Sequence, residues 1–564
     1  MKPSEPHSFR FLPKTYARLL LATAFLLLSV FNTEASRAER LIESWKPVHY
    51  RVFLTFDDQL SRLTNARTEL TFISLKERLT NIDLDFGEMP VDSITVNHKV
   101  VAFERSPGHL IVKLSQPARR GARLRLDVYY HGTPKDGLIL TTDKSGLPSA
   151  VGDNWPNRVH HWIPCLDHPS AKATVSFSLT VPVRLTTVAN GKLVGVRTNS
   201  DSTRTWTWSE GVPIPPYCMI IAVGEFALLA PSPRVTPSLA YYVPQVDREF
   251  APKGFAPAKS SLNFFTQTIA PYPYEKLALI VGATQFGGME NSSAIVFPST
   301  IFDSRRVAEP LSNLFGIREG IVEVLAHEIA HQWFGDSVTE STWSDLWLSE
   351  GFATYFAGLF LQRYEGEAVF QRYMQDAADK YLSYEKKVIT PLHDTETEDL
   401  FKLLNANNYE KGSWVLHMLR SEVGDKNFFA AIRAYYNGHR NATATTEDLR
   451  AALEKSSGRN LKLFFERWVY GTGHPTYALS WEWKGKEKTV RLILTQLQPG
   501  APFPNSVPIE ISTSGGRHRL VLQPVDKQTT KELRLDTFPS RITLDPDNSI
   551  LKEVNSVKND RSAS

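Results

Sequence analysis

Cysteine and net charge are both scarce in this sequence of 564 residues. Only Cys165 and Cys218 occur, and neither lies in a CxxC pair or in a Cys/His spacing typical of zinc, which argues against a cysteine-based metal site. The two residues are equally compatible with a disulfide in an oxidising compartment and with two buried thiols. Lys and Arg total 64 against 60 Asp and Glu, so the formal charge is only +4. This charge provides no global field for nucleic acid or an anionic membrane, and no nucleic-acid partner is expected.

Low-complexity segments and internal repeats of about 20 to 50 residues are also missing, which excludes a solenoid. Hydrophobic residues make up 42% of the sequence and charged residues 22%, a composition typical of folded globular domains. At roughly 100 to 200 residues per domain, the length predicts about three to five domains, each able to bury its own core.

The apolar run near the N-terminus is short. It extends from Leu19 to Phe31, only 13 residues, whereas a spanning helix needs about 20. Thr33, Glu34 and Ala35 follow, and their small residues fit a cleavage site. Basic residues precede the run, at Lys2, Arg10, Lys14 and Arg18. We therefore expect residues 1–36 to be a signal peptide, and the protein to be exported to the periplasm or the extracellular space without a stable membrane anchor after cleavage.

Hydrophobic periodicity divides the remaining chain into three regions. Alternating segments between Gly, Pro, Asn and Asp turns predict an antiparallel β domain over residues 37–230, which ends before a Pro-rich stretch. Apolar residues near a 3.6 period predict a mostly helical domain over residues 231–476. The period returns to two over residues 477–564, which predicts a small C-terminal β-sandwich and tail. The expected fold is therefore multidomain α+β. The predicted helices are Gly320–Phe334, Leu346–Arg363, Ala368–Leu382, Trp414–Val423, Asp425–Tyr436 and Thr446–Lys455.

One predicted helix contains the pattern His-Glu-x-x-His, at His327, Glu328 and His331. Histidines four residues apart share one helix face, so both rings can reach a single ion. A catalytic zinc site takes three protein ligands and leaves one position for water. Eighteen residues separate His331 from Glu350 on the next predicted helix, and this carboxylate supplies the third ligand. The sequence thus predicts one Zn²⁺ per chain, held by His327, His331 and Glu350.

Glu328 lies about 100° around the helix from His327, beside the predicted metal rather than on it. Zinc lowers the pKa of its water towards about 7, and Glu328 would act as general base, taking the proton before attack on a carbonyl and returning it to the leaving amine. The alternative is a surface helix with two solvated histidines. The apolar neighbours Leu325, Ile329 and Trp333 argue against it, because a buried His pair beside a buried Glu is costly unless coordinated.

Four blocks in the same order resemble the gluzincin zinc aminopeptidase family, which includes aminopeptidase N, alanyl aminopeptidase and leukotriene hydrolase. They are Phe286–Asn291, His327–Asp336, Trp343–Tyr355 and Tyr409–Gly412. Weaker similarity extends the match over about residues 48 to 476. The resemblance implies that the central domain is thermolysin-like and that the substrates are peptides with a free N-terminus.

By resemblance, the segment Gly287, Gly288, Met289, Glu290 is an exposed strand along which the peptide lies, with Glu290 gripping the terminal ammonium. A partly desolvated carboxylate recognises an ammonium by a charge-assisted hydrogen bond. The two glycines allow close backbone approach, and Met289 is expected in the side-chain pocket. The alternative is an ordinary turn with a solvated Glu. The position of Glu290, 37 residues before His327, matches the family and favours the binding role.

Tyr409 matches the tyrosine of the family whose hydroxyl donates to the oxyanion of the tetrahedral intermediate. Loss of one such donor typically costs about 100- to 1,000-fold in rate. The alternative is a core aromatic side chain that packs beneath the helix of Trp414.

Two departures from the family affect the substrate site. Many relatives carry a Gln that binds the amine shortly before the block around Cys165, but here the stretch contains Asp153, Asn154 and Trp155 and no Gln. Only 88 residues follow position 476, too few for the large helical C-terminal domain of many relatives. The active site is therefore expected to be more open.

The leading hypothesis is a zinc-dependent aminopeptidase that releases single N-terminal residues. The alternatives are a leukotriene-type epoxide hydrolase on the same metal and a non-catalytic zinc-containing binding protein. A non-catalytic member would be expected to lose Glu328, a ligand or Tyr409, and all are present. The sequence leaves open the preferred first residue and the oligomeric state.

Overall fold

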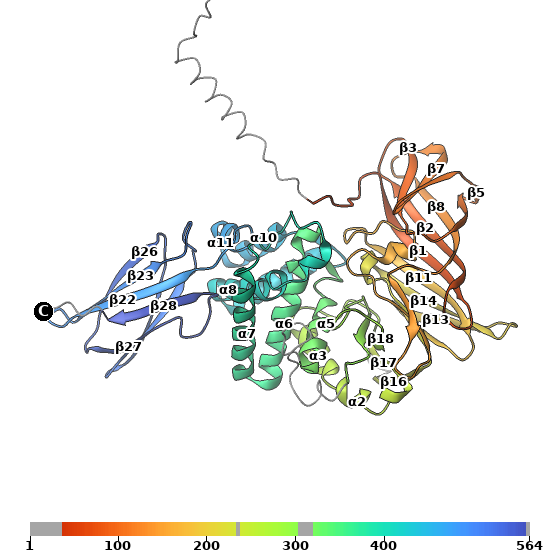
Figure 1. Ribbon diagram of the computed structural model, residues 1–564. Coiled ribbons are helices and arrows are strands. Elements are labelled where there is room, and N and C mark those ends of the chain that lie inside the picture. The colour runs from red at the N-terminus through yellow and green to blue at the C-terminus, as the bar shows by residue number, and fades with distance from the viewer. Residues whose placement is uncertain (1–36, 233–236, 303–319, 560–564) are drawn as a thin grey trace, which may run out of the picture.

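The computed structural model describes residues 37–232, 237–302 and 320–559 of the chain. These residues form three parts in a row: a β-rich N-terminal part, a largely helical central part and a β-rich C-terminal part (Figure 1). The predicted signal peptide, residues 1–36, lies outside the described residues. No helix in the described ranges is both long enough and apolar enough to cross a membrane.

The N-terminal part contains three sheets, with strand orders β13-β14-β11-β1-β2-β8-β4-β5, β12-β15-β10-β9 and β3-β7-β6. Neighbouring strands are antiparallel except for β1 and β11, which pair in parallel. The strands are β1 (Trp45–Phe56), β2 (Leu63–Ser74), β3 (Leu79–Asp85), β4 (Val91–Val96), β5 (Lys99–Val100), β6 (Phe103–Ser106), β7 (His109–Ala118), β8 (Arg123–Gly132), β9 (Leu138–Thr142), β10 (Pro148–Gly152), β11 (Ala173–Pro182), β12 (Thr186–Ala189), β13 (Lys192–Thr198), β14 (Thr203–Ile214) and β15 (Ile221–Gly224).

Burial along β1 explains why this region reads as sheet in the sequence. Tyr50, Val52 and Leu54 are at most 1% exposed, and each is followed by a residue that is exposed or only partly buried. Alternation with a period of two places the apolar residues on the core side of a pleated strand. Cys165 and Cys218 are both buried in this part and are not bonded to each other, so the alternative of two separate thiols holds in the structure.

A mixed four-stranded sheet in the order β16-β17-β18-β19 opens the central part. Its strands are β16 (Phe226–Ser232), β17 (Ser238–Pro244), β18 (Lys276–Gly282) and β19 (Ala294–Pro298). Since β16 pairs with β17, the Pro-rich stretch connects two strands of this sheet. Residues Phe226–Ser232, most of which precede the predicted boundary at 230, thus pair within the central sheet. Periodicity could not reveal this, because β16 is a short apolar run, Phe-Ala-Leu-Leu-Ala, without alternation of its own.

Helices pack on this sheet and form most of the central part. They are α2 (Ala251–Gly254), α3 (Pro257–Thr268), α5 (Ile321–His331), α6 (Trp347–Glu365), α7 (Glu367–Glu385), α8 (Gly412–Val423), α9 (Asp425–His439), α10 (Thr446–Ser457) and α11 (Lys462–Trp468). The short strands β20 (Val338–Glu340) and β21 (Ala442–Ala444) pair in parallel. Short helical turns are η1 (Val159–His161), η2 (Pro216–Cys218), η3 (Gln245–Asp247), η4 (Trp343–Asp345), η5 (Leu400–Leu403) and the π-helical turn η6 (Asn407–Lys411).

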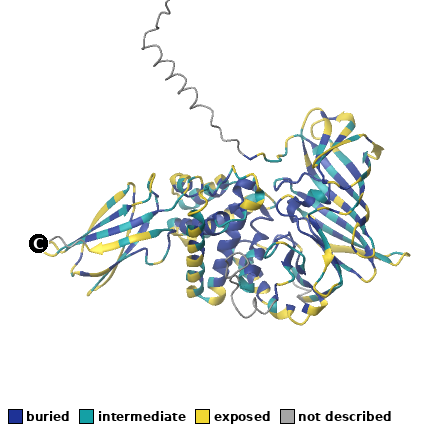
Figure 2. Ribbon diagram, in the orientation of Figure 1, coloured by how far each residue is buried: buried dark blue, intermediate teal, exposed yellow. Residues whose placement is uncertain are grey.

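The longest helices lie where the sequence places them, and α6 is the most buried. Every residue of α6 from Trp347 to Leu361 is buried, as the dark blue centre of Figure 2 illustrates. A helix that is apolar on all sides belongs in the middle of a large core. The sequence did not predict α3 or α11 as separate helices. α3 begins at a proline and carries Ser, Asn, Gln and Thr among its apolar residues, and α11 is only seven residues long, too short to establish a period.

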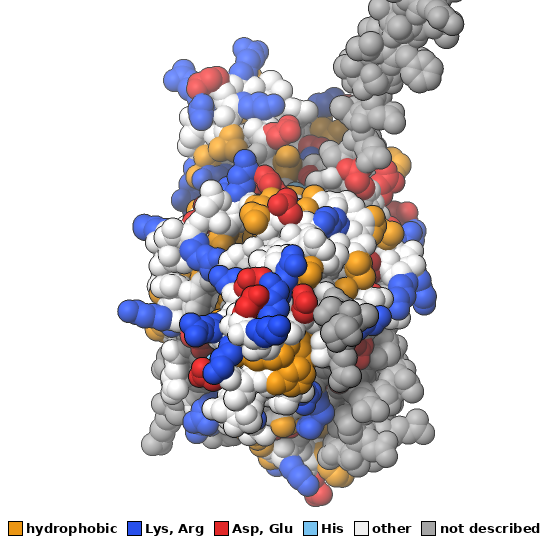
Figure 3. Space-filling view, turned by 90° about the vertical axis from the view of Figure 1, so that its left-hand side faces the viewer, with side chains coloured by type: hydrophobic (Ala, Val, Ile, Leu, Met, Phe, Trp, Pro, Cys, Tyr) orange, Lys and Arg blue, Asp and Glu red, His pale blue; other side chains and the backbone are white. Residues whose placement is uncertain are grey.

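The C-terminal part contains two sheets, in the orders β26-β23-β22-β28 and β25-β24-β27. Its strands are β22 (Thr476–Lys484), β23 (Thr489–Gln496), β24 (Val507–Thr513), β25 (Gly516–Leu522), β26 (Gln528–Arg534), β27 (Pro539–Leu544) and β28 (Glu553–Asn559). Trp468 at the end of α11 donates from its indole Nε1 to Asn505 Oδ1 at 2.8 Å, which ties this part to the helices. The view onto this end of the molecule shows Lys and Arg side chains mixed with Asp and Glu (Figure 3).

Candidate metal centre and substrate cleft

The two histidines of the His-Glu-x-x-His pattern lie at the C-terminal end of α5. The apolar residues Leu325 and Ile329 on this helix are fully buried, so α5 is a core helix and not the surface helix of the alternative interpretation. His331 Nδ1 lies 3.1 Å from the Phe334 carbonyl oxygen. With Nδ1 donating to that oxygen, Nε2 of His331 carries the lone pair that a metal needs. Burial lowers the pKa of His327, which also favours its neutral, metal-binding form.

Glu350 reaches the same point from the first turn of α6. Its Oε2 lies 3.3 Å from Nε2 of His327 and 3.3 Å from Nε2 of His331, and the two nitrogens are 3.0 Å apart. Within the described ranges Oε2 of Glu350 is buried and accepts no hydrogen bond. The three residues form the one His/Cys/Asp/Glu group in the described chain whose ligand atoms converge in this way.

This group fits a zinc ion. Two ligands at about 2.0 to 2.2 Å from a tetrahedral ion lie roughly 3.3 to 3.5 Å apart, close to the separations of 3.0 to 3.3 Å in the structure. Two imidazoles and one carboxylate are also the donor set of a zinc site that keeps a fourth position open. A buried carboxylate oxygen without a hydrogen-bond donor is costly unless a cation compensates it. The residues present therefore can hold one Zn²⁺.

Glu328 lies beside this group and is 6% exposed. Gly288 packs directly against its carboxylate: a Cβ at position 288 would lie 2.4 Å from Oε1 of Glu328. A side chain at position 288 would therefore displace the Glu328 carboxylate from its place beside the metal group. Gly287, in contrast, would have no atom within 4 Å of its Cβ, and it borders the open cleft. The two glycines thus serve different purposes, which the sequence alone did not distinguish.

The segment that contains Met289 and Glu290 is not a regular strand, contrary to the expectation from the resemblance. It makes one antiparallel bridge to β19, in which Met289 N donates to Val296 O at 2.8 Å and Val296 N donates to Met289 O at 2.9 Å. Glu290 is only 6% exposed, so the alternative of a turn with a solvated Glu does not hold. Burial raises the pKa of Glu290 to about 7. A carboxylate in this setting gains most from a cationic ligand.

Gln332 holds this segment in place, a role that the sequence analysis did not assign. Its Nε2 donates to the Glu290 carbonyl oxygen at 2.6 Å and to Asp336 Oδ2 at 2.7 Å. Its Oε1 accepts from Ser293 N at 2.8 Å and from the Tyr272 hydroxyl at 3.0 Å. All four bonding positions of the amide are therefore used. Gln332 directly follows His331 in the sequence, and this position indicates that it lies near the metal group. The sequence does not indicate its partners, because they come from distant parts of the chain.

Tyr409 lies in the π-helical turn η6 at the edge of the metal group. Its ring stacks on His327, with centroids 5.9 Å apart and an angle of 8° between the rings. Burial raises the pKa of Tyr409 well above its usual value, so the hydroxyl keeps its proton. A close crossing of α6 and α8 fixes this turn: a Cβ on Gly351 would lie 2.8 Å from the Cα of Gly412. Tyr409 lines the cleft, so it is not the core aromatic side chain of the alternative interpretation.

The stretch that lacks the family Gln places Trp155, and not its two polar neighbours, at the cleft. Asp153 accepts from Arg158 Nη2 at 2.9 Å and from the Thr284 hydroxyl at 3.0 Å, and Asn154 donates to the Met219 carbonyl oxygen, so both are fully buried with partners of their own. Trp155 lines the cleft and meets Phe286, with ring centroids 6.0 Å apart. Neither polar residue therefore takes the place of the Gln.

One cleft of about 1070 Å³ joins the predicted site residues. The metal group, Glu328, Glu290 and Tyr409 border it together, as do Gly287, Gly288 and Met289. The facing wall comes from α7 and the segment before η6. This wall carries both acidic and basic side chains, namely Asp376, Asp379, Lys380, Lys387 and Glu410. No motif in the sequence assigns this wall to the site.

Two family models match the regions that build this cleft. The model described as "Peptidase family M1 domain" matches residues 255–468, and the model described as "Peptidase M1 N-terminal domain" matches residues 46–218. The chain belongs to peptidase family M1. This assignment agrees with the resemblance to gluzincin aminopeptidases, and the β-rich N-terminal part and helical catalytic region of this M1 chain agree with the expected fold.

Relatives of this M1 chain include glutamyl aminopeptidase of Rattus norvegicus, which is 27% identical over 371 residues, or 63% of this chain and 38% of the relative. Tricorn protease-interacting factor F2 of Thermoplasma acidophilum is 27% identical over 437 residues, or 76% of this chain and 53% of the relative. The chain thus spans about half or less of the length of these relatives.

A solved structure of similar fold is the M1 zinc metallopeptidase from Deinococcus radiodurans. It aligns with a TM-score of 0.63 and 24% identity, and the alignment covers 77% of this M1 chain and 95% of the other. The arrangement of a β-rich N-terminal part before a helical catalytic region is therefore shared with that protein.

Proposed function

We propose that this protein is a zinc-dependent aminopeptidase that hydrolyses the first peptide bond of peptides with a free N-terminus. The observation that carries the proposal is the cleft in which Glu290 and Glu328 lie beside the convergent group of His327, His331 and Glu350. Membership of family M1 and the names of the relatives, several of them aminopeptidases, support it.

Each of the predicted site residues has a distinct part in this reaction. His327, His331 and Glu350 would hold Zn²⁺, which when bound polarises the scissile carbonyl and activates water. Glu328 is positioned to accept a proton from water and to pass it to the leaving amine. The protonated hydroxyl of Tyr409 donates a hydrogen bond where negative charge develops on the carbonyl oxygen. The carboxylate of Glu290 binds the terminal ammonium and so restricts cleavage to the first bond.

The walls near Glu290 favour an apolar first residue. Trp155 stands edge-to-face to Phe286 and to Phe401, with ring centroids 6.0 and 5.9 Å apart, and Met289 borders the same space. Phe401 is 42% exposed, so part of its ring remains available for contact. An apolar side chain of the substrate would remove this surface from water, which is worth roughly 25 cal/mol per Å².

The proposal is tested with a panel of aminoacyl anilides, a lipid epoxide and wild-type protein beside Glu328→Gln. We expect the wild type to release the anilide from unblocked substrates, fastest for apolar residues, and the variant to lose turnover. Hydrolysis of the epoxide without release of any anilide would replace the proposal by the epoxide hydrolase hypothesis. Absence of both activities in zinc-loaded protein would favour the non-catalytic binding protein.

Export and an open cleft complete the proposal. The basic residues before the apolar run at Leu19–Phe31 support cleavage of a signal peptide near Ala35, which N-terminal sequencing of the exported protein tests.

We further propose that the two C-terminal sheets pack as a small β-sandwich and do not close the cleft as a large helical domain would. Decapeptides should then be cleaved at rates comparable to dipeptides, and a strict preference for dipeptides would contradict this.

A further inference from the structure

The segment that follows α5 carries groups that position two parts of the site. We call residues 332–339 the post-α5 segment. The Phe334 carbonyl oxygen lies 3.1 Å from Nδ1 of His331, and Gln332 Nε2 donates to the Glu290 carbonyl oxygen at 2.6 Å. The position of this segment therefore affects a predicted zinc ligand and also the residue proposed to bind the terminal ammonium.

Lys172 of the N-terminal part bonds to this segment. It directly precedes β11, at the edge of the part that Figure 1 shows beside the helices. Its Nζ donates to the carbonyl oxygens of Asp336 and Ser337, both at 2.8 Å. Thr339 Oγ1 at 2.9 Å and the Ala442 carbonyl oxygen at 3.2 Å are also within reach of this ammonium. Since an ammonium has three protons to donate, it can hold several oxygens of the segment together.

Two further side chains of the N-terminal part bond to the post-α5 segment. The Tyr217 hydroxyl donates to the Gly335 carbonyl oxygen at 3.3 Å. Cys218 Sγ donates to Asp336 Oδ1 at 3.1 Å, and burial raises the pKa of this thiol, so it keeps the proton that it donates. The N-terminal part therefore holds Asp336 at both its backbone and its carboxylate.

Asp336 is connected to Glu290 through Gln332. The two protons of Gln332 Nε2 go to Asp336 Oδ2 at 2.7 Å and to the Glu290 carbonyl oxygen at 2.6 Å. Asp336 and Gln332 are 0% exposed, so bulk water does not replace these bonds. A displacement of Asp336 would therefore turn the amide and shift the Glu290 backbone. Three hydrogen bonds of 2.6 to 2.8 Å connect Lys172 to Glu290, although Lys172 does not border the cleft.

We propose that Lys172 is a positioning residue for recognition of the terminal ammonium of the substrate. It fixes the backbone of Asp336, and Gln332 transmits this constraint to the segment of Glu290. Residues in one hydrogen-bond network are energetically coupled, so loss of one member affects the others. The inference rests on the function proposed above, in which Glu290 binds the ammonium. The N-terminal part then contributes to amine recognition from outside the cleft.

The test compares wild type and Lys172→Met, both full-length and zinc-loaded, on an aminoacyl anilide and on the same substrate with an acetylated amine. Methionine keeps the unbranched shape of the side chain and removes the ammonium. We expect the ratio of the two kcat/KM values, unblocked over acetylated, to fall at least about threefold. A merely structural contact between the two parts would lower both values alike. An unchanged ratio would overturn the proposal, whereas a wild type that hydrolyses neither substrate would contradict the proposed function.

Lys144→Met is the matched control. Lys144 also belongs to the N-terminal part and bonds to the central part, through Asp247 Oδ1 at 2.6 Å and the Ser299 carbonyl oxygen at 3.0 Å. None of these three residues lies in the post-α5 segment or borders the cleft. This variant should leave the ratio unchanged. A fall as large as that in Lys172→Met would show that any weakened contact between the two parts has this effect, and would refute the role of Lys172.

The double variant Glu290→Gln, Lys172→Met tests whether Lys172 acts through Glu290. Because the charge of Glu290 is already removed, the ratio should be no lower in the double variant than in Glu290→Gln alone. A second loss that adds to the first would place the effect of Lys172 elsewhere and refute the proposal.

Thr339→Val is a milder variant for the same test, and it replaces Lys172→Met if urea unfolding shows that Lys172→Met does not fold. Thr339 Oγ1 accepts from Lys172 and donates to the Asp336 carbonyl oxygen at 3.0 Å. Its removal should lower the ratio in the same direction, by about twofold. No change in the ratio for this variant would also count against the proposal.

Discussion

Replacement of Glu290 by Gln tests how this protein recognises a free N-terminus. The substitution keeps the size and the hydrogen-bonding shape of the side chain, and it leaves the backbone carbonyl free to accept from Gln332 as before. It removes the negative charge that faces the terminal ammonium. Glu290 carries this interaction largely by itself, because Asp153 and Asn154 are fully buried with partners of their own.

The expected loss follows from the burial of Glu290, which is 6% exposed. A hydrogen bond to a charged group contributes about 1.5 to 3 kcal/mol, which corresponds to roughly 10- to 150-fold in kcat/KM for an unblocked aminoacyl anilide. Glu410→Gln is the control, since Glu410 also borders the cleft but accepts from Lys380 Nζ at 2.9 Å. It should change kcat/KM little, because this carboxylate, although buried like that of Glu290, is paired with Lys380 and not with the substrate.

The assay compares each variant on an unblocked anilide and on the same substrate with an acetylated amine. We expect Glu290→Gln to reduce the advantage of the unblocked substrate, because only that substrate carries the ammonium. An equal loss on both substrates would assign Glu290 to the architecture of the cleft instead of to amine recognition.

The remaining predictions concern the oxyanion, the metal, the side-chain pocket and the pH dependence of stability. Tyr409→Phe should lower kcat about 100- to 1,000-fold with little change in KM, and a KM effect alone would contradict the role in stabilising the oxyanion. Removal of metal by a chelator should abolish hydrolysis and added Zn²⁺ should restore it, whereas full activity in metal-free protein would exclude the proposed mechanism. Phe401→Ala should reduce the preference for phenylalanyl over alanyl anilide several-fold without unfolding the protein, because Phe401 is 42% exposed; an unchanged ratio of kcat/KM values would remove it from the pocket. Burial, assisted by Arg420, lowers the pKa of His417 from 6.5 to about 4, so the unfolded chain binds more protons between these values and stability falls as the pH drops through this window. At pH 5 this histidine lowers the free energy of unfolding by about 2 kcal/mol. Urea unfolding at pH 7 and at pH 5 should therefore show a weaker pH dependence of that free energy for His417→Gln than for the wild type.

The sequence predicted the metal group well because its geometry is largely local. The four-residue spacing of His327 and His331 already defines one helix face. Glu350 lies in the first turn of a helix whose many apolar residues predict that the helix is buried. The regular strands were predictable for the same reason, since alternation along β1 is visible in the sequence itself.

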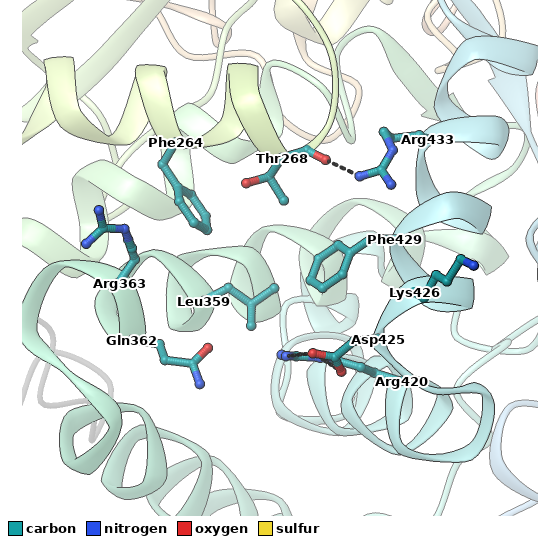
Figure 4. A pocket seen from close by; sticks show the side chains of 10 residues that line it. All are labelled: Phe264, Thr268, Leu359, Gln362, Arg363, Arg420, Asp425, Lys426, Phe429 and Arg433. Carbon is teal, nitrogen blue, oxygen red and sulfur yellow. Dashed lines mark hydrogen bonds and ion pairs between the residues drawn. The ribbon is translucent and has the colours of Figure 1, made fainter.

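Other features depend on contacts between distant segments. Gln332 holds Glu290 through bonds to residues about 40 to 60 positions earlier, at Ser293 and Tyr272, and no local pattern announces them. The wall of α7 faces the cleft only because of how the helices pack. The cavity between α3, α6, α8 and α9 likewise brings together residues that are scattered along the chain (Figure 4).

The amino-acid sequence by itself determined the order of sheet and helix, the three residues that converge as the metal group and the position of Glu328 beside them, since all of these follow from periodicity and spacing within one or two elements. Only the tertiary structure decided that Trp155 and not Asp153 or Asn154 borders the cleft, and that Gly288 and Gly287 serve different purposes. The physical reason is that side-chain direction and close packing depend on which surfaces meet, and a pattern along one strand or helix does not specify its partner.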